Sequence, residues 1–253
     1  MRVVVIGSGN VATVLGRRMK AMGHEPLQVV SRNLDHARVL ANELNCEATG
    51  PYGQVNKSAD LYLIAVNDNA LLEINKQFHL GRLLVVHTAG SMSMDVLQSV
   101  SSNFGVLYPL QSLFKNMEPD TDIPFLVEGN SPETQTIIAD FAGTLSGKVA
   151  NATDEERLKL HVAAVVVNNF TNHLYALVEE FCRKENVDFN LLVPLIQETA
   201  QRLATHSPSS MQTGPAIRND LVTVEKHLRL LARFPVLKSL YLKFTDSIMN
   251  RQT

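Results

Sequence analysis

The chain has 253 residues, 45% of them hydrophobic and 19% charged, with a formal net charge of −2. This balance gives no reason to expect nucleic acid or an acidic membrane surface as a partner. The longest apolar stretch, Val162 to Val167, is far too short to span a bilayer, and the N-terminal apolar run lacks the pattern of a signal peptide. We therefore expect a cytoplasmic protein of two domains, in which Cys46 and Cys182 stay reduced.

The N-terminus combines an apolar run with a glycine turn. Met1 to Ile6 is rich in β-branched residues and predicts a strand, and Gly7 to Ala12 follows it in the pattern G-x-G-x-x-A. Apolar residues with helical spacing continue after the turn. A strand, a glycine turn and a helix in this order predict a dinucleotide site.

Each position of this turn has a physical role. Gly7 permits a tight reversal, Gly9 lacks a Cβ so that a diphosphate can approach the backbone, and Ala12 lets the helix pack closely on the strand. The helix that begins near Asn10 presents unpaired N–H groups and its positive dipole end to phosphates. The alternative is a tight turn in another kind of α/β domain. The residues expected to hold the diphosphate are Gly7, Ser8, Gly9, Asn10 and Val11.

The end of the second strand, Pro26 to Val30, indicates which dinucleotide binds. NAD sites usually carry an acid there, which holds the ribose hydroxyls. Ser31, Arg32 and Asn33 stand in its place, and together they can donate several hydrogen bonds to a 2′-phosphate. This favours NADP as the cofactor. Alternatively, Ser31 or Asn33 caps the helix Leu34 to Leu44, and Arg32 is solvated.

Strands and helices go on alternating up to about residue 152. Near-continuous apolar strands of this kind are typical of a parallel sheet covered on both faces. Residues 1–152 are therefore expected to form a Rossmann-like, doubly wound α/β domain. Its further strands are predicted at Leu61 to Val66, Leu83 to Val86, Gly105 to Tyr108, Phe125 to Glu128 and Lys148 to Ala150, and its further helices at Leu71 to Phe78, Met94 to Val100 and Pro132 to Leu145.

Polar or glycine-rich turns follow four of these strands. Ligands of open parallel sheets bind at the carboxyl ends of the strands, so these turns should line one cleft. We expect Ala65-Val66-Asn67 beside the adenosine ribose and diphosphate, and His87-Thr88-Ala89 near the nicotinamide. His87 could exchange a proton, although a histidine at a strand end is more often a structural hydrogen-bonding group.

From Thr153 onward the pattern becomes helical. Thr153 offers an N-cap with acids in the first turn, and no strand-like alternation follows. Residues 153–253 are therefore expected to form an all-helical domain. Its helices are predicted at Glu155 to Glu185, Asn190 to His206, Asp220 to Leu231 and after Pro235.

The first of these helices carries a polar stripe. His161, Asn168 and Asn172 step by seven and four residues, so they should share one face of an α-helix, with Asn169 beside them. Buried amides and imidazoles need hydrogen-bond partners. The stripe could form the wall of a substrate pocket. Equally, it could satisfy loop carbonyls or an oligomer contact.

A polar loop lies between two later helices. Arg218 could clamp a substrate carboxylate with two hydrogen bonds, and Asp220 could orient it. Equally, Asp220 could cap its helix while Arg218 forms a surface ion pair. The residues expected to contact substrate are Asn168, Thr213, Gly214, Arg218 and Asp220.

Together these segments resemble a known family, a group of bacterial NADP oxidoreductases. Their N-terminal domain is similar to deazaflavin-coenzyme-dependent NADP oxidoreductases and pyrroline-5-carboxylate reductases, and their helical C-terminal domain has no defined function. The resemblance implies a Rossmann domain, a homodimer built on the helical domain and a substrate cleft between the domains. It is carried by the glycine turn, Ser31-Arg32, His87 to Ser91, Tyr108 to Ser112, His161 to Asn169, and Thr213-Gly214-Pro215 with Arg218, Asp220 and His227.

One position departs from the related β-hydroxyacid dehydrogenases. These place Lys-x-x-x-Asn on the first interdomain helix, and if Asn169 takes the Asn position, Val165 takes that of the lysine. Without that lysine, His161 is the titratable group on this helix best suited to proton transfer. No residue that we can identify supports a deazaflavin coenzyme.

The sequence thus predicts an NADP-dependent oxidoreductase that moves hydride between NADPH and a small carbonyl or imine substrate. His161 is the expected acid or base, and Asn169 is the expected orienting group. No metal site is expected. The alternative is an NADP-binding sensor or scaffold without hydride transfer, which the missing lysine also fits.

Overall fold

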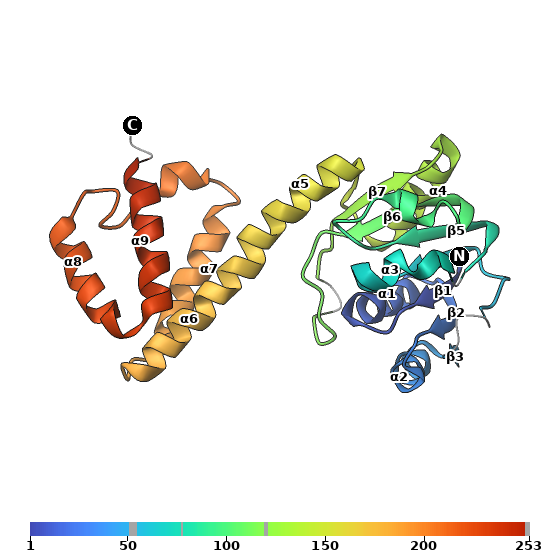
Figure 1. Ribbon diagram of the computed structural model, residues 1–253, viewed down its shortest axis with the longest axis horizontal. Helices are drawn as coiled ribbons and strands as arrows, with labels where there is room; N and C mark the ends of the chain where they lie inside the picture. Colours follow the sequence, from blue (N-terminus) through green and yellow to red (C-terminus); the bar gives the residue numbers. More distant parts are fainter. Residues whose placement is uncertain (51–54, 77, 119–120, 251–253) are drawn as a thin grey trace. The chain divides into compact units, whose positions relative to one another are not determined.

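The computed structural model describes residues 1–50, 55–76, 78–118 and 121–250 (Figure 1). The chain forms two compact units, Met1–Val166 (unit 1) and Val167–Thr253 (unit 2). Unit 1 therefore extends past the predicted boundary at residue 152 and includes the helix that begins at Asp154.

Unit 1 is built on a sheet with the strand order β3-β2-β1-β4-β5-β6-β7-β8. The part from β3 to β6 has the strand order of the Rossmann fold. Neighbouring strands run parallel, as predicted, except that β6 and β7 pair antiparallel. The strands are β1 (Arg2–Ile6), β2 (Glu25–Val30), β3 (Glu47–Thr49), β4 (Leu61–Ile64), β5 (Gly81–His87), β6 (Ser101–Pro109), β7 (Phe125–Gly129) and β8 (Val149–Asn151).

Two of these strands correct the sequence analysis. The prediction of a fully parallel sheet is wrong at β7, because the chain leaves β6 at Pro109 and begins β7 at Phe125 directly opposite, so β7 runs antiparallel to β6 without a crossover. The short strand β3 was not predicted, since its three residues carry little apolar signal and it is held by pairing with β2.

The helices of unit 1 begin where local capping residues predict them. Asn33 accepts a hydrogen bond from the N–H of His36 at the start of α2, and Ser131 caps α4. The predicted helix Leu71 to Phe78 is a short α-helix followed by a 3₁₀ turn, Ile74–Lys76, and the predicted helix Met94 to Val100 is a 3₁₀ turn, Met94–Leu97. The α-helices are α1 (Asn10–Ala21), α2 (Leu34–Leu44), α3 (Asp68–Leu72), α4 (Pro132–Leu145) and α5 (Asp154–Ala164).

The sheet is buried on both faces, as the near-continuous apolar strands predict. Along β1, Val3 and Val5 belong to one core cluster, and Val4 and Ile6 belong to the other. The first cluster includes residues of α1, α2 and α4, and the second includes residues of α3 and of the 3₁₀ turns. Coverage of both faces leaves the ends of the strands as the polar edges of unit 1.

Unit 2 is helical, with α6 (Thr171–Lys184), α7 (Val193–Arg202), α8 (Leu221–Leu230) and α9 (Pro235–Met249). The predicted single helix Glu155 to Glu185 is interrupted, because a π-helical segment, Val165–Phe170, lies between α5 and α6. This segment begins with three consecutive valines, whose β-branched side chains fit an α-helix poorly. The spacing argument that placed His161, Asn168 and Asn172 on one α-helical face therefore does not hold.

Two other features are absent from the described residues. No helix in the described ranges is both long and apolar enough to cross a membrane. No group of three or more histidine, cysteine or acidic side chains in the same ranges could hold a metal ion. The cytoplasmic location and the absence of a metal site stay predictions.

Candidate active site

The turn after β1 has the geometry that the sequence predicts. Gly7 has φ +126°, and a Cβ at this position would lie 2.1 Å from the carbonyl oxygen of Ala65. Gly9 has no atom within 4 Å of where its Cβ would be. Gly9 is the N-cap of α1 and makes no side-chain hydrogen bond, so no side chain at the cap occupies the first N–H groups of the helix. Backbone amides around an uncapped helix start fit a diphosphate group.

The end of β2 lies directly beside this turn. The hydroxyl oxygens of Ser8 and Ser31 are 2.9 Å apart, and Ser31 is buried. Asn33 caps α2, which is the structural alternative to contacting a 2′-phosphate. Arg32 is exposed and forms no ion pair with any described residue. The structure therefore joins Ser8 and Ser31 and leaves Arg32, the next residue, exposed.

The next strand end along the sheet is that of β4. The N–H of Ala65 donates to the carbonyl of Ile6 at 2.8 Å, which holds the β4 end against the glycine turn. Asn67 caps α3 by accepting from the N–H of Ala70 at 2.9 Å. Since β2, β1, β4 and β5 are parallel neighbours, their carboxyl ends meet at one edge, as predicted.

His87 ends β5 and is fully buried. Its Nδ1 accepts from the N–H of Ala89 at 3.1 Å, and its Nε2 lies 3.3 Å from the carbonyl oxygen of Ser93, to which it donates. Burial, together with the nearby charge of Arg157, lowers the pKa of His87 to about 4. Both ring nitrogens are engaged and the ring is neutral, so His87 has the structural role rather than that of a proton carrier.

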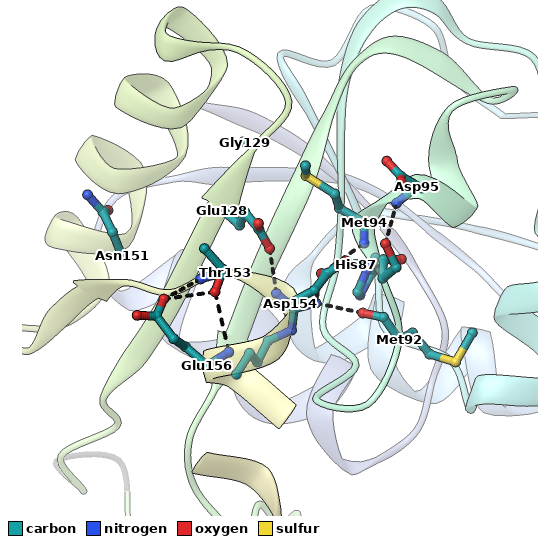
Figure 2. A network of polar contacts seen from close by, with 12 residues as sticks. His87, Met92, Met94, Asp95, Glu128, Gly129, Asn151, Thr153, Asp154 and Glu156 are labelled. Carbon is teal, nitrogen blue, oxygen red and sulfur yellow. Dashed lines mark hydrogen bonds and ion pairs between the residues drawn. The ribbon is translucent and has the colours of Figure 1, made fainter. Parts of the chain in front are cut away.

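A buried arginine ties α5 to the segment after β5. The side chain of Arg157 is 1% exposed, and it donates to Glu128 on β7 at 2.8 Å and to the carbonyl of Met92 at 2.6 Å. It also pairs with Asp154, which accepts from the N–H of Met94. Figure 2 shows Glu128, Asp154 and Met92 converging from three segments of unit 1. We call these four residues with Met94 the Arg157 network.

The carboxylates of this network respond to burial differently. Burial raises the pKa of Glu128, against the opposing effect of Arg157. Burial also disfavours the charged form of Asp154, but hydrogen bonds from Ser93 and Arg157 outweigh it and hold the pKa of Asp154 below its ordinary value. Asp154 therefore keeps its charge, and the ion pair fixes the first turn of α5.

One turn further along α5, His161 meets Tyr108. The phenolic oxygen of Tyr108 lies 2.9 Å from Nδ1 of His161, and the two rings are edge to face with centroids 5.9 Å apart. Tyr108 stands near the carboxyl end of β6 and is 9% exposed. Burial raises the pKa of Tyr108, although the charge of Arg157 opposes this. The pair places a hydrogen-bonding imidazole at the edge of the sheet where the four predicted strand ends meet.

The remaining candidates lie in unit 2. Asn168 and Asn169 belong to the π-helical segment and are exposed. Asp220 caps α8, accepting from the N–H and the hydroxyl of Thr223, and these bonds lower its pKa. Thr213 and Arg218 are exposed. The capping role foreseen for Asp220 is thus confirmed.

Sequence reasoning gave no role to several residues of this region. Tyr108 was noted only as part of a motif, and Arg157 and Glu128 were not singled out. A cation at residue 157, which directly follows three acidic residues, resembles any solvated helix residue, so no local pattern marks it. Only the pairing of distant segments shows that it is buried.

Two family models match the chain. The model described as "NADP oxidoreductase coenzyme F420-dependent" matches residues 2–90. The model described as "Domain of unknown function (DUF2520)" matches residues 123–248. A search of curated proteins found no match.

Solved structures are similar over nearly the whole chain. A Bacteroides fragilis protein titled "putative NADP oxidoreductase BF3122" is 40% identical with a TM-score of 0.92, covering 98% of this chain and 98% of that chain. The 1-pyrroline-5-carboxylate reductase of Streptococcus pyogenes is 15% identical with a TM-score of 0.67, covering 99% of this chain and 98% of that chain. An imine reductase from Myxococcus stipitatus, solved with NADP⁺, is 15% identical with a TM-score of 0.64, covering 99% of this chain and 92% of that chain.

The last two similarities concern the fold alone. The similarity to the Bacteroides fragilis protein is high enough in identity and coverage to show kinship, and it agrees with both family models. The chain therefore belongs to the family of NADP oxidoreductases that join an N-terminal domain of the coenzyme F420-dependent type to a DUF2520 domain.

Proposed function

We propose that this oxidoreductase is an NADPH-dependent reductase of small carbonyl or imine compounds. When bound, NADPH supplies hydride to the substrate carbon while the oxygen or nitrogen takes one proton, so that the products are NADP⁺ and an alcohol or amine. The observation that carries the proposal is the open turn at Gly9, where no side chain caps α1. Two proteins of the same fold are named for the reduction of C=N compounds, which supports an imine as the substrate.

In this proposal the backbone from Gly7 to Val11 holds the diphosphate. The run Ala65-Val66-Asn67 lies beside the turn and flanks the adenosine ribose and diphosphate. The run His87-Thr88-Ala89 contributes its backbone near the nicotinamide, because the side chain of His87 is engaged on both nitrogens. These assignments follow from the position of the runs at one edge of the sheet.

NADP rather than NAD is proposed as the coenzyme. A 2′-phosphate beside the ribose would meet the guanidinium of Arg32 and the hydroxyl of Ser31, both at the end of β2. No acid stands at this position to repel the phosphate. An exposed arginine without an ion-pair partner in the described chain is suited to charge-assisted hydrogen bonds.

His161 is proposed to donate the proton that balances the hydride. It is half-buried, lies at the edge of the sheet where the strand ends meet, and is held by Tyr108. Asn169 is proposed as an orienting amide. On unit 2, the proposed substrate contacts stay those that the sequence indicates, namely Asn168, Thr213, Gly214, Arg218 and Asp220.

A homodimer through the helical domain is part of the proposal. Among the described residues of unit 2, the buried hydrophobic ones are Cys182, Ala216, Val224, Leu231 and Phe234. Large apolar side chains on the same unit are exposed, including Leu191 at 77% and Val167 at 71%. So much exposed apolar surface supports a further protein contact. Sedimentation that gives a monomer at all accessible concentrations would contradict it.

Calorimetry combined with turnover assays tests the function. We expect NADPH to bind more tightly than NADH, and NADPH to be oxidised with at least one member of a panel of small ketones, aldehydes and cyclic imines. Binding without any turnover would favour the sensor or scaffold. No heat with either coenzyme would refute both alternatives.

The glycine turn offers a sharper variant. Gly9→Ala adds one methyl group into a space with no protein atom within 4 Å, at an ordinary φ of −79°. The fold should tolerate it, whereas the diphosphate should lose its approach to the backbone. We expect NADPH affinity to fall at least about tenfold. Gly143→Ala, on α4 and equally unhindered, is the matched control and should bind normally.

A further inference from the structure

The Tyr108–His161 contact is enclosed by three segments of unit 1. Tyr108 comes from β6, His161 comes from α5, and Gly90 follows β5. A Cβ at Gly90 would lie 2.8 Å from Nδ1 of His161 and 2.9 Å from Cε2 and Cζ of Tyr108. Only a glycine lets the chain pass this close to both rings. The two rings are therefore held in place by packing as well as by their hydrogen bond.

The hydrogen between the two rings has two possible positions. Either Tyr108 donates its O–H to Nδ1, or Nδ1–H donates to the phenolic oxygen. Burial raises the pKa of Tyr108, so the phenol keeps its hydrogen at neutral pH. Among the described residues, the hydroxyl of Tyr108 has no other hydrogen-bond partner.

Burial decides between these two arrangements. If Nδ1 carried the hydrogen, the O–H of Tyr108 would be left without an acceptor on a side chain that is nine-tenths buried, which is costly. If Tyr108 donates, the hydrogen of the neutral imidazole is on Nε2. His161 is only half-buried and its Nε2 has no partner in the described part of the chain, so water or a substrate can accept from it.

We infer that Tyr108 is a positioning residue that donates its phenolic hydrogen to Nδ1 of His161 and thereby fixes the neutral imidazole as the Nε2–H tautomer. The functional consequence rests on the proposed function. A neutral His161 of this tautomer offers a substrate oxygen or nitrogen a hydrogen-bond donor, while the lone pair of Nδ1, which would serve a base, is occupied. When Nε2 gives its hydrogen to the substrate, the phenolic hydrogen of Tyr108 passes to Nδ1, so the imidazole stays neutral and the step is balanced.

Nitrogen NMR of the full-length protein tests the inference without coenzyme or substrate. Long-range proton–nitrogen correlation spectra of protein labelled with ¹⁵N-histidine distinguish the two tautomers, at a pH about two units above the ordinary histidine pKa. The His161→Gln spectrum identifies the signals of His161. We expect the Nε2–H pattern for the unaltered protein. An Nδ1–H pattern would overturn the inference.

Three variants extend the test. Tyr108→Phe keeps the ring and removes the hydroxyl, so the His161 nitrogen signals should shift toward a mixture of tautomers. Gly90→Ala should shift the same signals by separating the rings. Tyr62→Phe removes another hydroxyl, which donates to the carbonyl of Asn56 at 2.8 Å, and should leave His161 unchanged. Unchanged His161 signals in both Tyr108→Phe and Gly90→Ala would refute the role of Tyr108.

Kinetics separates this inference from the proposed function. If the protein reduces a substrate, Tyr108→Phe should lower kcat by roughly 10-fold or more and leave the KM for NADPH unchanged. A fixed tautomer in a protein that turns over nothing would refute the reductase and support the positioning role. Turnover with an Nδ1–H tautomer would support the reductase and refute the positioning role.

Discussion

Replacing Arg157 by methionine should destabilise unit 1 strongly. The side chain of Arg157 is 1% exposed, and its partners Glu128 and Asp154 are 16% and 39% exposed. Removing one partner of a buried ion pair typically costs about 3–5 kcal/mol, since it leaves an uncompensated charge in the interior. Methionine can occupy the apolar path of the arginine stem but leaves Glu128 and the carbonyl of Met92 without their donor.

The expected loss lies near the lower end of that range. Burial already raises the pKa of Glu128, so the carboxyl can take a proton when the arginine is gone and limit the cost. Asp154 keeps contact with solvent and the N–H of Met94. We therefore expect about 3 kcal/mol at neutral pH. The double variant Arg157→Met with Glu128→Met should be more stable than the sum of the single changes by about 1–3 kcal/mol.

Urea unfolding followed by circular dichroism measures this loss, because the chain has no tryptophan to report by fluorescence. With a slope of about 3 kcal/mol per molar urea, the midpoint should fall by about 1 M. The control is Lys159→Met on the same helix, whose pair with Glu155 is exposed and should contribute little. An Arg157→Met midpoint no lower than that of Lys159→Met would refute the reasoning.

Three further predictions concern protonation, coenzyme choice and turnover. The pKa of His87 is lowered to about 4, so between that value and about 6.5 the unfolded chain binds more protons than the folded one. The free energy of unfolding should therefore fall by roughly 3 kcal/mol as the pH drops through this window. The His87→Gln variant, compared with the unaltered protein at each pH, should lack this loss. In calorimetry, Arg32→Ala should weaken NADPH binding roughly 10- to 100-fold and NADH binding much less. The control Arg38→Ala, whose arginine pairs with Asp35, should affect neither. Equal weakening of the binding of both coenzymes would contradict the phosphate role of Arg32. His161→Ala should cut turnover by roughly 10²-fold or more, with the exposed His206→Ala as control, and unchanged turnover would remove His161 from the mechanism.

The sequence predicted the features that depend on residues close together in the chain. The turn at Gly7, the helices Leu34–Leu44 and Pro132–Leu145, and the helical second half follow from hydrophobic spacing and capping groups within a few positions. The family resemblance, based on short motifs of the same kind, is confirmed by the comparisons. The π-helical segment was not predicted, because the residue pattern of Val165–Phe170 does not distinguish i→i+5 hydrogen bonds from those of an α-helix.

The tertiary structure decided which side chains meet. Tyr108 and His161 are 53 positions apart, and Arg157 and Met92 are 65 apart, so neither contact leaves a mark in any local window. The order of strands in the sheet brings these segments together, and burial then determines the ionisation of His87 and the pairing of Arg157. Local sequence sets the backbone period and the turns, whereas contacts across the sheet depend on topology and on the free energy of burying polar groups, which no short segment contains.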